Sequence, residues 1–275
     1  MNGVPPSSLI PHPSSFGTLV FTYQFDFSVI FRPESLSLIA RGLIVTLLLT
    51  VLSSLIAVGL GWAGAMMTTS GRGIVRSIVC WAIEVFRNVP ALVQVFFWSF
   101  AFPLMLPGDV RVPLLFNNPP IDWLQAQTGV HAYYFAALVL GLSLNSGAYL
   151  ADIFRAGIES VGDGQIAAGL ASGLTRRQVM RDVILPQALH VSFPPLTGRL
   201  VHTLKNTALA VFVPVPDLFS ALQTATSKTF RGLEFLIVGV VMYLALGWLM
   251  GAILTSLDRR RASWAMEGEQ AKWSN

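Results

Sequence analysis

The chain contains apolar stretches long enough to cross a lipid bilayer, and this feature restricts its fold more than any other. A membrane-spanning helix needs about 20 predominantly apolar residues. Ser37–Met67 exceeds that length, with Arg41 near its start as the single charged residue. Across the chain, 53% of residues are hydrophobic and 12% are charged, whereas soluble domains have about 25% charged residues. These properties predict an all-α integral membrane protein.

Four further segments reach spanning length, so the sequence predicts about five transmembrane helices. They are Ile78–Leu106, Tyr133–Ile153, Leu185–Val213 and Phe235–Leu257. Pro90 interrupts the first of these four, and we expect a kink there because proline lacks an amide donor. The chain then divides into a lead segment, residues 1–36, one transmembrane domain, residues 37–258, and a C-terminal tail, residues 259–275.

The positive charges near the ends of these helices are unevenly distributed. One side carries nine: Arg72, Arg76, Arg155, Arg176, Arg177, Arg181, Arg259, Arg260 and Arg261. The other side has Arg32, Arg111, Lys228 and Arg231, with Arg41 near the boundary. Because cytoplasmic loops are enriched in Lys and Arg, we expect a periplasmic N-terminus and a cytoplasmic C-terminus. This asymmetry explains the net charge of +4. The sequence therefore predicts that the chain contacts membrane lipid and does not bind nucleic acid.

A polar loop, Glu159–Gln187, separates the third and fourth expected spans. Gln165–Leu174 is expected to form a short helix with Ile166, Leu170 and Leu174 on one stripe. Gly173 would end this helix, and Thr175 would cap a second one that starts at Arg176 and stops before Pro186. We interpret the stripe as a docking surface. The alternative is an ordinary connecting loop rich in small residues.

Several classes of chemistry lack their motifs. None of the three lysines stands in a Gly-Lys-Ser/Thr sequence, so the chain is not expected to bind ATP through a P-loop. It has no intact GxSxG motif, a single cysteine (Cys80) and no histidine spacing that suggests ligands. The sequence therefore predicts a protein that is not an enzyme and that holds no metal or cofactor of its own.

Four segments match, in order, the motifs of one transporter family. Along the chain they are the Glu84–Phe97 run with FRNVP, LSLNSGAYLADIFRAGI at 142–158, GQIAAGLASG at 164–173 followed by ILPQA at 184–188, and LKNTAL at 204–209. The chain thus resembles the membrane-spanning permease subunits of bacterial ABC importers for polar amino acids. The resemblance implies a type I importer permease fold, in which the loop helix docks into an ATPase subunit. The implied coupling residues are Gly164, Gln165, Ile166, Ala167, Ala168, Gly169, Leu170, Ala171 and Gly173.

This loop departs from the family pattern at two positions. Ala167 stands where the family has glutamate, and Gly169 stands where it has its second alanine. Without the acid, docking is expected to depend on shape, on apolar contact and on Asp163, Arg176 or Arg177. The two arginines have a second interpretation as anchors that keep the loop on the positive side of the membrane.

Polar side chains inside the expected spans are candidates for the substrate pathway, because ionisable groups in a bilayer are costly. They are Glu84, Arg87, Gln94, Arg199, His202, Lys205 and Asn206. The functional hypothesis is that some of Arg87, Arg199, His202 and Lys205 attract a carboxylate. The structural alternative is that Glu84 pairs with Arg87, and that a buried acid such as Asp152 holds Arg199.

The resemblance implies that this chain translocates its substrate by alternating access in the bacterial inner membrane. The implied partners are two ABC ATPase subunits carrying ATP and Mg, a second permease subunit, identical or homologous, and a periplasmic solute-binding protein. The substrate is expected to be a polar L-amino acid, with glutamate/aspartate or broad specificity favoured. The alternatives are an ion-coupled secondary transporter, a channel, and a permease for another small polar solute.

Overall fold

The computed structural model describes residues 23–71 and 73–273, and these residues form helices joined by short turns, without strands. The helices, with η marking 3₁₀ or π-helical segments, are η3 (Phe27–Phe31), α1 (Pro33–Ser70), α2 (Ile74–Asn88), α3 (Ala91–Phe96), η4 (Phe97–Ala101), α4 (Phe102–Leu104), α5 (Gly108–Arg111), η5 (Val112–Phe116), α6 (Pro119–Thr128), α7 (Ala132–Glu159), α8 (Asp163–Ala171), α9 (Arg176–Gln178), η6 (Val179–Ile184), α10 (Leu185–Asn206), η7 (Thr207–Phe212), α11 (Leu218–Thr229) and α12 (Gly232–Trp273). The first part of the expected lead segment, Met1–Thr22, and Arg72 lie outside the described residues.

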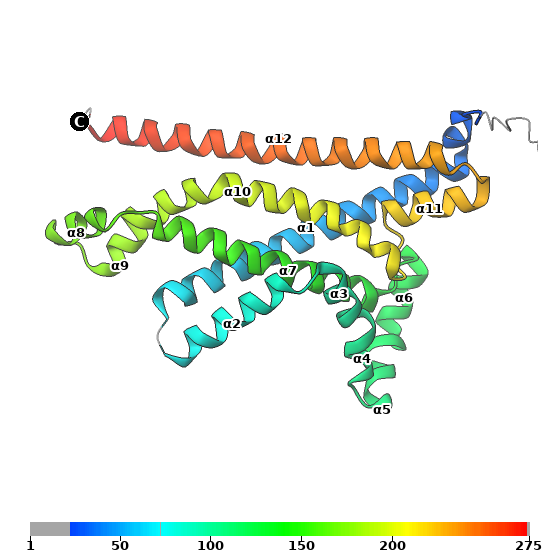
Figure 1. Cartoon of the computed structure of the whole chain (residues 1–275), viewed down its shortest axis with the longest axis horizontal. Coiled ribbons are helices and arrows are strands. Elements are labelled where there is room, and N and C mark those ends of the chain that lie inside the picture. Colours follow the sequence, from blue (N-terminus) through cyan, green and yellow to red (C-terminus); the bar gives the residue numbers. More distant parts are fainter. Residues whose placement is uncertain (1–22, 72, 274–275) are drawn as a thin grey trace, which may run out of the picture.

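Four long helices, α1, α7, α10 and α12, run along the length of the molecule (Figure 1). The most extensive helix contact joins α1 to α7, and α10 packs against α7 and α12. α8 and α9 lie at the end where α12 finishes, whereas α11 lies at the opposite end with the start of α1 (Figure 1). The loop between α7 and α10 therefore projects from one end of the helix bundle.

Three helices in the described residues are long and apolar enough to span a membrane: α1, α7 and α12. A fourth span results if α2 and the helix of residues 91–104, which meet at an angle of 104°, are counted as one. The remaining expected span, α10, is too polar to qualify by hydropathy because it carries Arg199, His202 and Lys205. It nevertheless packs against α7 and α12 and buries one stripe of residues, which includes Ser192, Leu196 and Leu200.

The predicted kink at Pro90 is a complete break of the helix. α2 ends at Asn88, and α3 begins at Ala91. The Nε2 atom of the buried Gln94 donates to the carbonyl oxygens of Phe86 and Val89, at 2.7 and 2.9 Å. A helix end leaves its last carbonyls without amide donors, so Gln94 stabilises the break by supplying two of these missing bonds.

Glycines allow α1 and α7 to approach closely. A Cβ atom on Gly61 would lie 2.5 Å from Cβ of Leu150, and one on Gly64 would lie 3.0 Å from Cβ of Ala151. On the facing helix, a Cβ on Gly147 would lie 3.0 Å from Cβ of Leu60. Small residues at such contacts are typical of membrane helix pairs, whose association depends on van der Waals packing.

The described part of the lead segment contacts the start of α12. The hydroxyl of Tyr23 donates to the Glu234 carboxylate, and the Asp26 amide donates to Glu234 Oε1 at 2.9 Å. Arg231 donates from Nη1 to the carbonyl oxygen of Gln24 at 2.7 Å. These bonds hold the segment against the end of the bundle that is opposite α8.

Candidate functional site

The expected loop helix is present as α8, although it ends at Ala171 and not at Leu174, and the glycine expected to end it stands just beyond its last turn. It covers Asp163–Ala171, and Gly173 follows with φ of 85°, a left-handed conformation that favours glycine. Thr175 then caps the next helix: its Oγ1 accepts from the Gln178 amide, and the Gln178 side chain accepts from the Thr175 amide. This capping box fixes the direction in which the chain leaves α8.

The apolar stripe expected for docking is largely internal. Ile166 and Leu174 pack against a cluster that includes Ile158, Val179 and Ile184, and only Leu170 of the stripe is exposed. Gly169 is buried, and a Cβ atom there would lie 2.9 Å from Cγ2 of Val179. The stripe therefore holds α8 against its own chain.

The free surface of α8 consists of small residues around one leucine. Its exposed members are Asp163, Gly164, Gln165, Ala167, Ala168, Leu170 and Ala171. Ala167, the position of the family's glutamate, thus faces outward, where a longer side chain has room. The glycine that replaces the family's second alanine, in contrast, allows α8 to touch η6.

The second loop helix does not stop before Pro186, contrary to the prediction. Arg176–Gln178 continues through the π-helical turn η6 into α10, where Pro186 occupies the first turn. A proline is tolerated in a first turn because its missing amide would have no α-helical partner there. The wider η6 turn lies directly before it, so α9, η6 and α10 follow one another without an intervening loop.

A row of polar side chains runs along α7 between α2 and α10. Asn145, Tyr149 and Asp152 occupy helical spacings of four and three, which place them on one face. Asn145 and Tyr149 bond to backbone carbonyls of α2, whereas Asp152 contacts Arg87. Asp152 also lines a small cavity of ≈ 330 Å³ with residues of α10, including Val191 and Pro195. This row and the side chains that meet it form the candidate pathway site.

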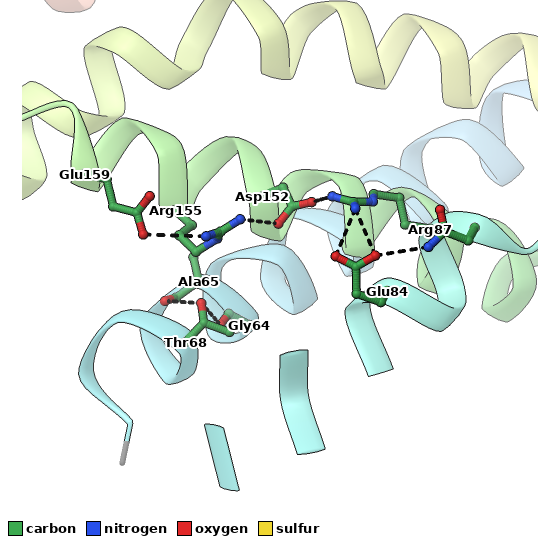
Figure 2. Close-up of polar contacts among 9 residues, drawn as sticks. Gly64, Ala65, Thr68, Glu84, Arg87, Asp152, Arg155 and Glu159 are labelled. Carbon is green, nitrogen blue, oxygen red and sulfur yellow. Dashed lines mark hydrogen bonds and ion pairs between the residues drawn. The ribbon is translucent and has the colours of Figure 1, made fainter. Parts of the chain in front are cut away.

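An alternating series of charges continues this row toward α8 (Figure 2). Arg87 donates from Nη2 to both carboxylate oxygens of Glu84, at 2.9 Å each, and from Nη1 to Asp152. Arg155 bonds to Asp152 at 3.1 Å and pairs with Glu159 at 3.6 Å. The predicted Glu84–Arg87 pair is therefore present, and its arginine also ties α2 to α7.

Arg199 has neutral partners, and its pairing with Asp152, the structural alternative, is absent from the described residues, where Asp152 bonds to Arg87 and Arg155. Arg199 Nη2 donates to Asn145 Oδ1 at 2.5 Å and lies 3.3 Å from Ser146 Oγ. Its guanidinium carbon lies 3.9 Å from the centroid of the Tyr149 ring. Arg199 makes no ion pair within residues 23–71 and 73–273, and its buried Nε has no hydrogen-bond partner there. Its positive charge is therefore not neutralised by the described residues.

The other predicted pathway residues lie in three different places. His202 is exposed one turn along α10 from Arg199, and its Nδ1 lies 3.3 Å from Nδ2 of Asn206. Lys205 lines a groove of ≈ 670 Å³ with α11 and α12, on another face of α10. Gln94 is 4% exposed and is occupied with the helix break. The structure thus groups Arg199, His202 and Asn206 and sets Lys205 and Gln94 apart from them.

Sequence reasoning missed Asn145, Tyr149 and Arg155 as members of the site. They lie in the segment 142–158 that carried the family resemblance, and the spacing of 145, 149 and 152 was a readable signal of a polar helix face. Arg155 pairs with Asp152 and Glu159 of its own helix, but the partners of Asn145 and Tyr149 in α2 and α10 are about 60 residues away in sequence. No local pattern indicates those partners.

In the turn before α11, Asp217 has a structural role. This carboxylate is fully buried and caps α11 by accepting from the amides of Phe219 and Ser220. The hydroxyl of Tyr243 also donates to it, at 3.2 Å. Burial raises the pKa of Asp217, and these hydrogen bonds act in the opposite direction. The hydrogen bond between Tyr243 and Asp217 therefore joins the start of α11 to the neighbouring helix α12.

Comparison with known proteins identifies the family. Residues 56–263 match the model of the family described as "Binding-protein-dependent transport system inner membrane component". The chain is 33% identical over 237 residues to the glutamine transport system permease protein GlnP of Escherichia coli (strain K12), covering 86% of this chain and 98% of GlnP. It is 32% identical over 209 residues to the arginine transport system permease protein ArgU of Corynebacterium glutamicum, covering 76% and 63% of the two chains.

Solved structures agree with this result. A chain of the crystal structure of "an amino acid ABC transporter with histidines" is 29% identical, with a TM-score of 0.70, and the match covers 86% of this chain and 100% of that one. A chain of the inward-facing MetNI methionine ABC transporter is 18% identical, with a TM-score of 0.59, covering 82% and 97%. The second similarity shows the type I importer fold alone.

Proposed function

This chain belongs to the family of binding-protein-dependent transport system inner membrane components, and on that basis we propose which solutes it carries and how. It is a permease subunit of an amino acid ABC importer and performs no catalysis itself. We propose that it translocates polar amino acids along the open face between α2, α7 and α10. Arg199 meets the carboxylate of the solute there.

The observation that carries this proposal is the depth of the polar row. Asn145 lies at the middle of the 28-residue helix α7, and Asp152 lies about 10 Å further along it, at 1.5 Å per residue. With the middle of α7 placed at the bilayer centre, both positions fall within a hydrocarbon core that extends about 15 Å on either side. Charged groups at this depth face a water-filled path or a protein partner, because lipid does not satisfy them.

A second permease subunit, identical or homologous, completes this path in our proposal. One chain offers an open face with Glu84 and His202 exposed on it, and a facing subunit would separate these groups from lipid. Two ABC ATPase subunits, which carry ATP and Mg, dock one on the α8 helix of each permease subunit, and a periplasmic binding protein delivers the solute to the opposite end. The excess of arginine around α8 supports a cytoplasmic position for this end, with the N-terminus in the periplasm of a bacterial inner membrane.

The charges along the path favour solutes that present a carboxylate. Glu84 and Asp152 are neutralised by Arg87 and Arg155, whereas Arg199 has only neutral partners within the described residues. An unneutralised guanidinium attracts a carboxylate and repels a cationic side chain. We therefore propose glutamine, glutamate or aspartate as solutes and disfavour arginine, although one relative is named as an arginine permease.

Reconstitution tests this function. The permease, its ATPase subunits and liganded binding protein are placed in vesicles, and the initial uptake of radiolabelled glutamine, glutamate, aspartate and arginine is measured with and without ATP. We expect ATP-dependent uptake, with arginine transported slowest. Uptake driven by an ion gradient without ATP would instead establish the alternative of a secondary transporter. Uptake of arginine alone would contradict the proposed role of the charges.

Two glutamate substitutions on α8 test the docking surface. Leu170→Glu places a charge at the apolar centre of the free face, and we expect it to weaken ATPase association about thirtyfold, as loss of an interface hot spot does. Ala167→Glu adds the same charge at the position of the family's acid, and we expect association to be retained or strengthened. Pull-down of the ATPase subunits with purified permease measures both. Because both residues are exposed, neither change should alter the unfolding temperature, and equal loss in both variants would refute this docking face.

A further inference from the structure

Two side chains of α7 join the broken end of α2 to Arg199. Asn145 donates from Nδ2 to the carbonyl oxygen of Phe86 at 3.1 Å, and its Oδ1 accepts from Arg199 Nη2 at 2.5 Å. Tyr149 donates its hydroxyl hydrogen to the carbonyl oxygen of Arg87 at 3.1 Å, and its ring faces the Arg199 guanidinium. Each residue thus makes one contact with α2 and one with α10.

The break at Pro90 is what makes the α2 contacts possible. Carbonyls at the end of a helix lack amide donors, and here side chains of α3 and α7 supply the hydrogens. Bonding to the backbone of α2 restricts the rotamers of Asn145 and Tyr149. As a result, the amide oxygen of one and the ring of the other remain directed at Arg199.

The groups around Arg199 orient its charge without neutralising it. An amide oxygen, a hydroxyl and an aromatic ring all attract a guanidinium, but none of them carries a full negative charge. Arg87, in the last turn of α2, differs from Arg199 because Glu84 and Asp152 both pair with its guanidinium. Arg199 Nε remains buried and without a hydrogen-bond partner in the described part of the chain.

We propose that Asn145 and Tyr149 are positioning residues that hold the Arg199 guanidinium for the carboxylate of the transported amino acid. Through the same two side chains, the position of Arg199 depends on the bend between α2 and α3. A displacement of α2 along α7 would therefore change the presentation of the cation. This inference rests on the proposed function, since it requires that Arg199 contacts the solute.

A double-mutant cycle tests whether Tyr149 acts through Arg199. The variants are Tyr149→Leu, Arg199→Lys and the two combined, each assembled with its ATPase subunits in vesicles with saturating liganded binding protein. We expect Tyr149→Leu to lower the initial rate of glutamine uptake about tenfold, because the stacking contact is lost. In the Arg199→Lys background the same change should cost less than about twofold, since an ammonium group lacks the planar face that stacks on the ring. Tyr149→Phe, which keeps the ring, should lie between wild type and Tyr149→Leu.

Tyr133→Leu is the matched control. Tyr133 lies on the same helix and donates its hydroxyl to the carbonyl of Trp98, far from Arg199. Its effect should be the same factor in both backgrounds, as expected for independent sites. The rise in unfolding temperature that glutamine produces in the permease–ATPase complex without binding protein gives a second readout, which follows solute binding even where uptake is too slow to measure.

The outcomes separate this inference from the proposed function. A loss at Tyr149→Leu that disappears in the Arg199→Lys background supports positioning. An equal loss in both backgrounds, or no loss in either, would show that Tyr149 does not act through Arg199. Absence of ATP-dependent uptake of every amino acid by the wild-type complex would instead refute the proposed function itself.

Discussion

Replacing Arg199 with methionine is expected to lower the initial rate of amino acid uptake about a hundredfold. Truncating one partner of a buried, hydrogen-bonded charge contact typically costs between about 2 and 5 kcal/mol. Methionine keeps a similar aliphatic length and removes the cation, so the contact with the solute carboxylate is lost while the helix packing is largely retained. Uptake into vesicles that contain the complete importer measures this loss, and basal ATP hydrolysis should stay near that of the wild type.

Lys205→Met is the matched control for this variant. It removes a cation from the same helix, but Lys205 lies in the groove beside α12 and not beside Asn145 and Tyr149. We expect uptake to fall less than about threefold, the range of a surface change away from specific contacts. If Arg199→Met transports normally with normal assembly, the guanidinium has no role in solute recognition. If both variants lose uptake equally, the positive charge of α10 acts without a specific site.

Replacing Gly61 with valine is expected to destabilise the folded protein by about 3 kcal/mol, the upper part of the range for overpacked cores. The added Cβ would lie 2.5 Å from Cβ of Leu150 and 3.0 Å from its backbone carbonyl carbon. Backbone atoms do not move aside as a flexible side chain does, so α1 and α7 must separate. Because this is the most extensive helix contact in the bundle, we expect a lower unfolding temperature in detergent and a reduced yield of assembled complex.

Gly59→Val makes the same chemical change two residues earlier in α1. A Cβ atom on Gly59 would meet no atom within 4 Å, and valine has a better helix propensity than glycine. We expect an unfolding temperature equal to or above that of the wild type. Equal destabilisation by the two variants would mean that valine disturbs α1 locally and that the contact with Leu150 is not responsible.

Local sequence patterns predicted the helices well where the physical cause was itself local. The hydropathy of α1, α7 and α12 requires burial in lipid or protein. Gly173 adopts the left-handed conformation that follows α8, and the Thr175 side chain caps α9. The prediction for Pro186 was wrong because a proline has different consequences in a helix interior and in a first turn after a π-helical segment. Distinguishing these cases requires the backbone hydrogen bonds of η6.

The chain's membrane location, its helical class, its loop helix and its family were all readable from residues close together in sequence. The local sequence did not indicate which of the arginines in the apolar segments is neutralised by carboxylates. Arg87 and Arg199 look equivalent as charges within apolar segments, yet Arg87 pairs with two carboxylates and Arg199 rests on neutral groups. Only the packing of α2 and α10 against opposite sides of the polar row on α7 decides this, because electrostatic partners are chosen by distance in space and not along the chain.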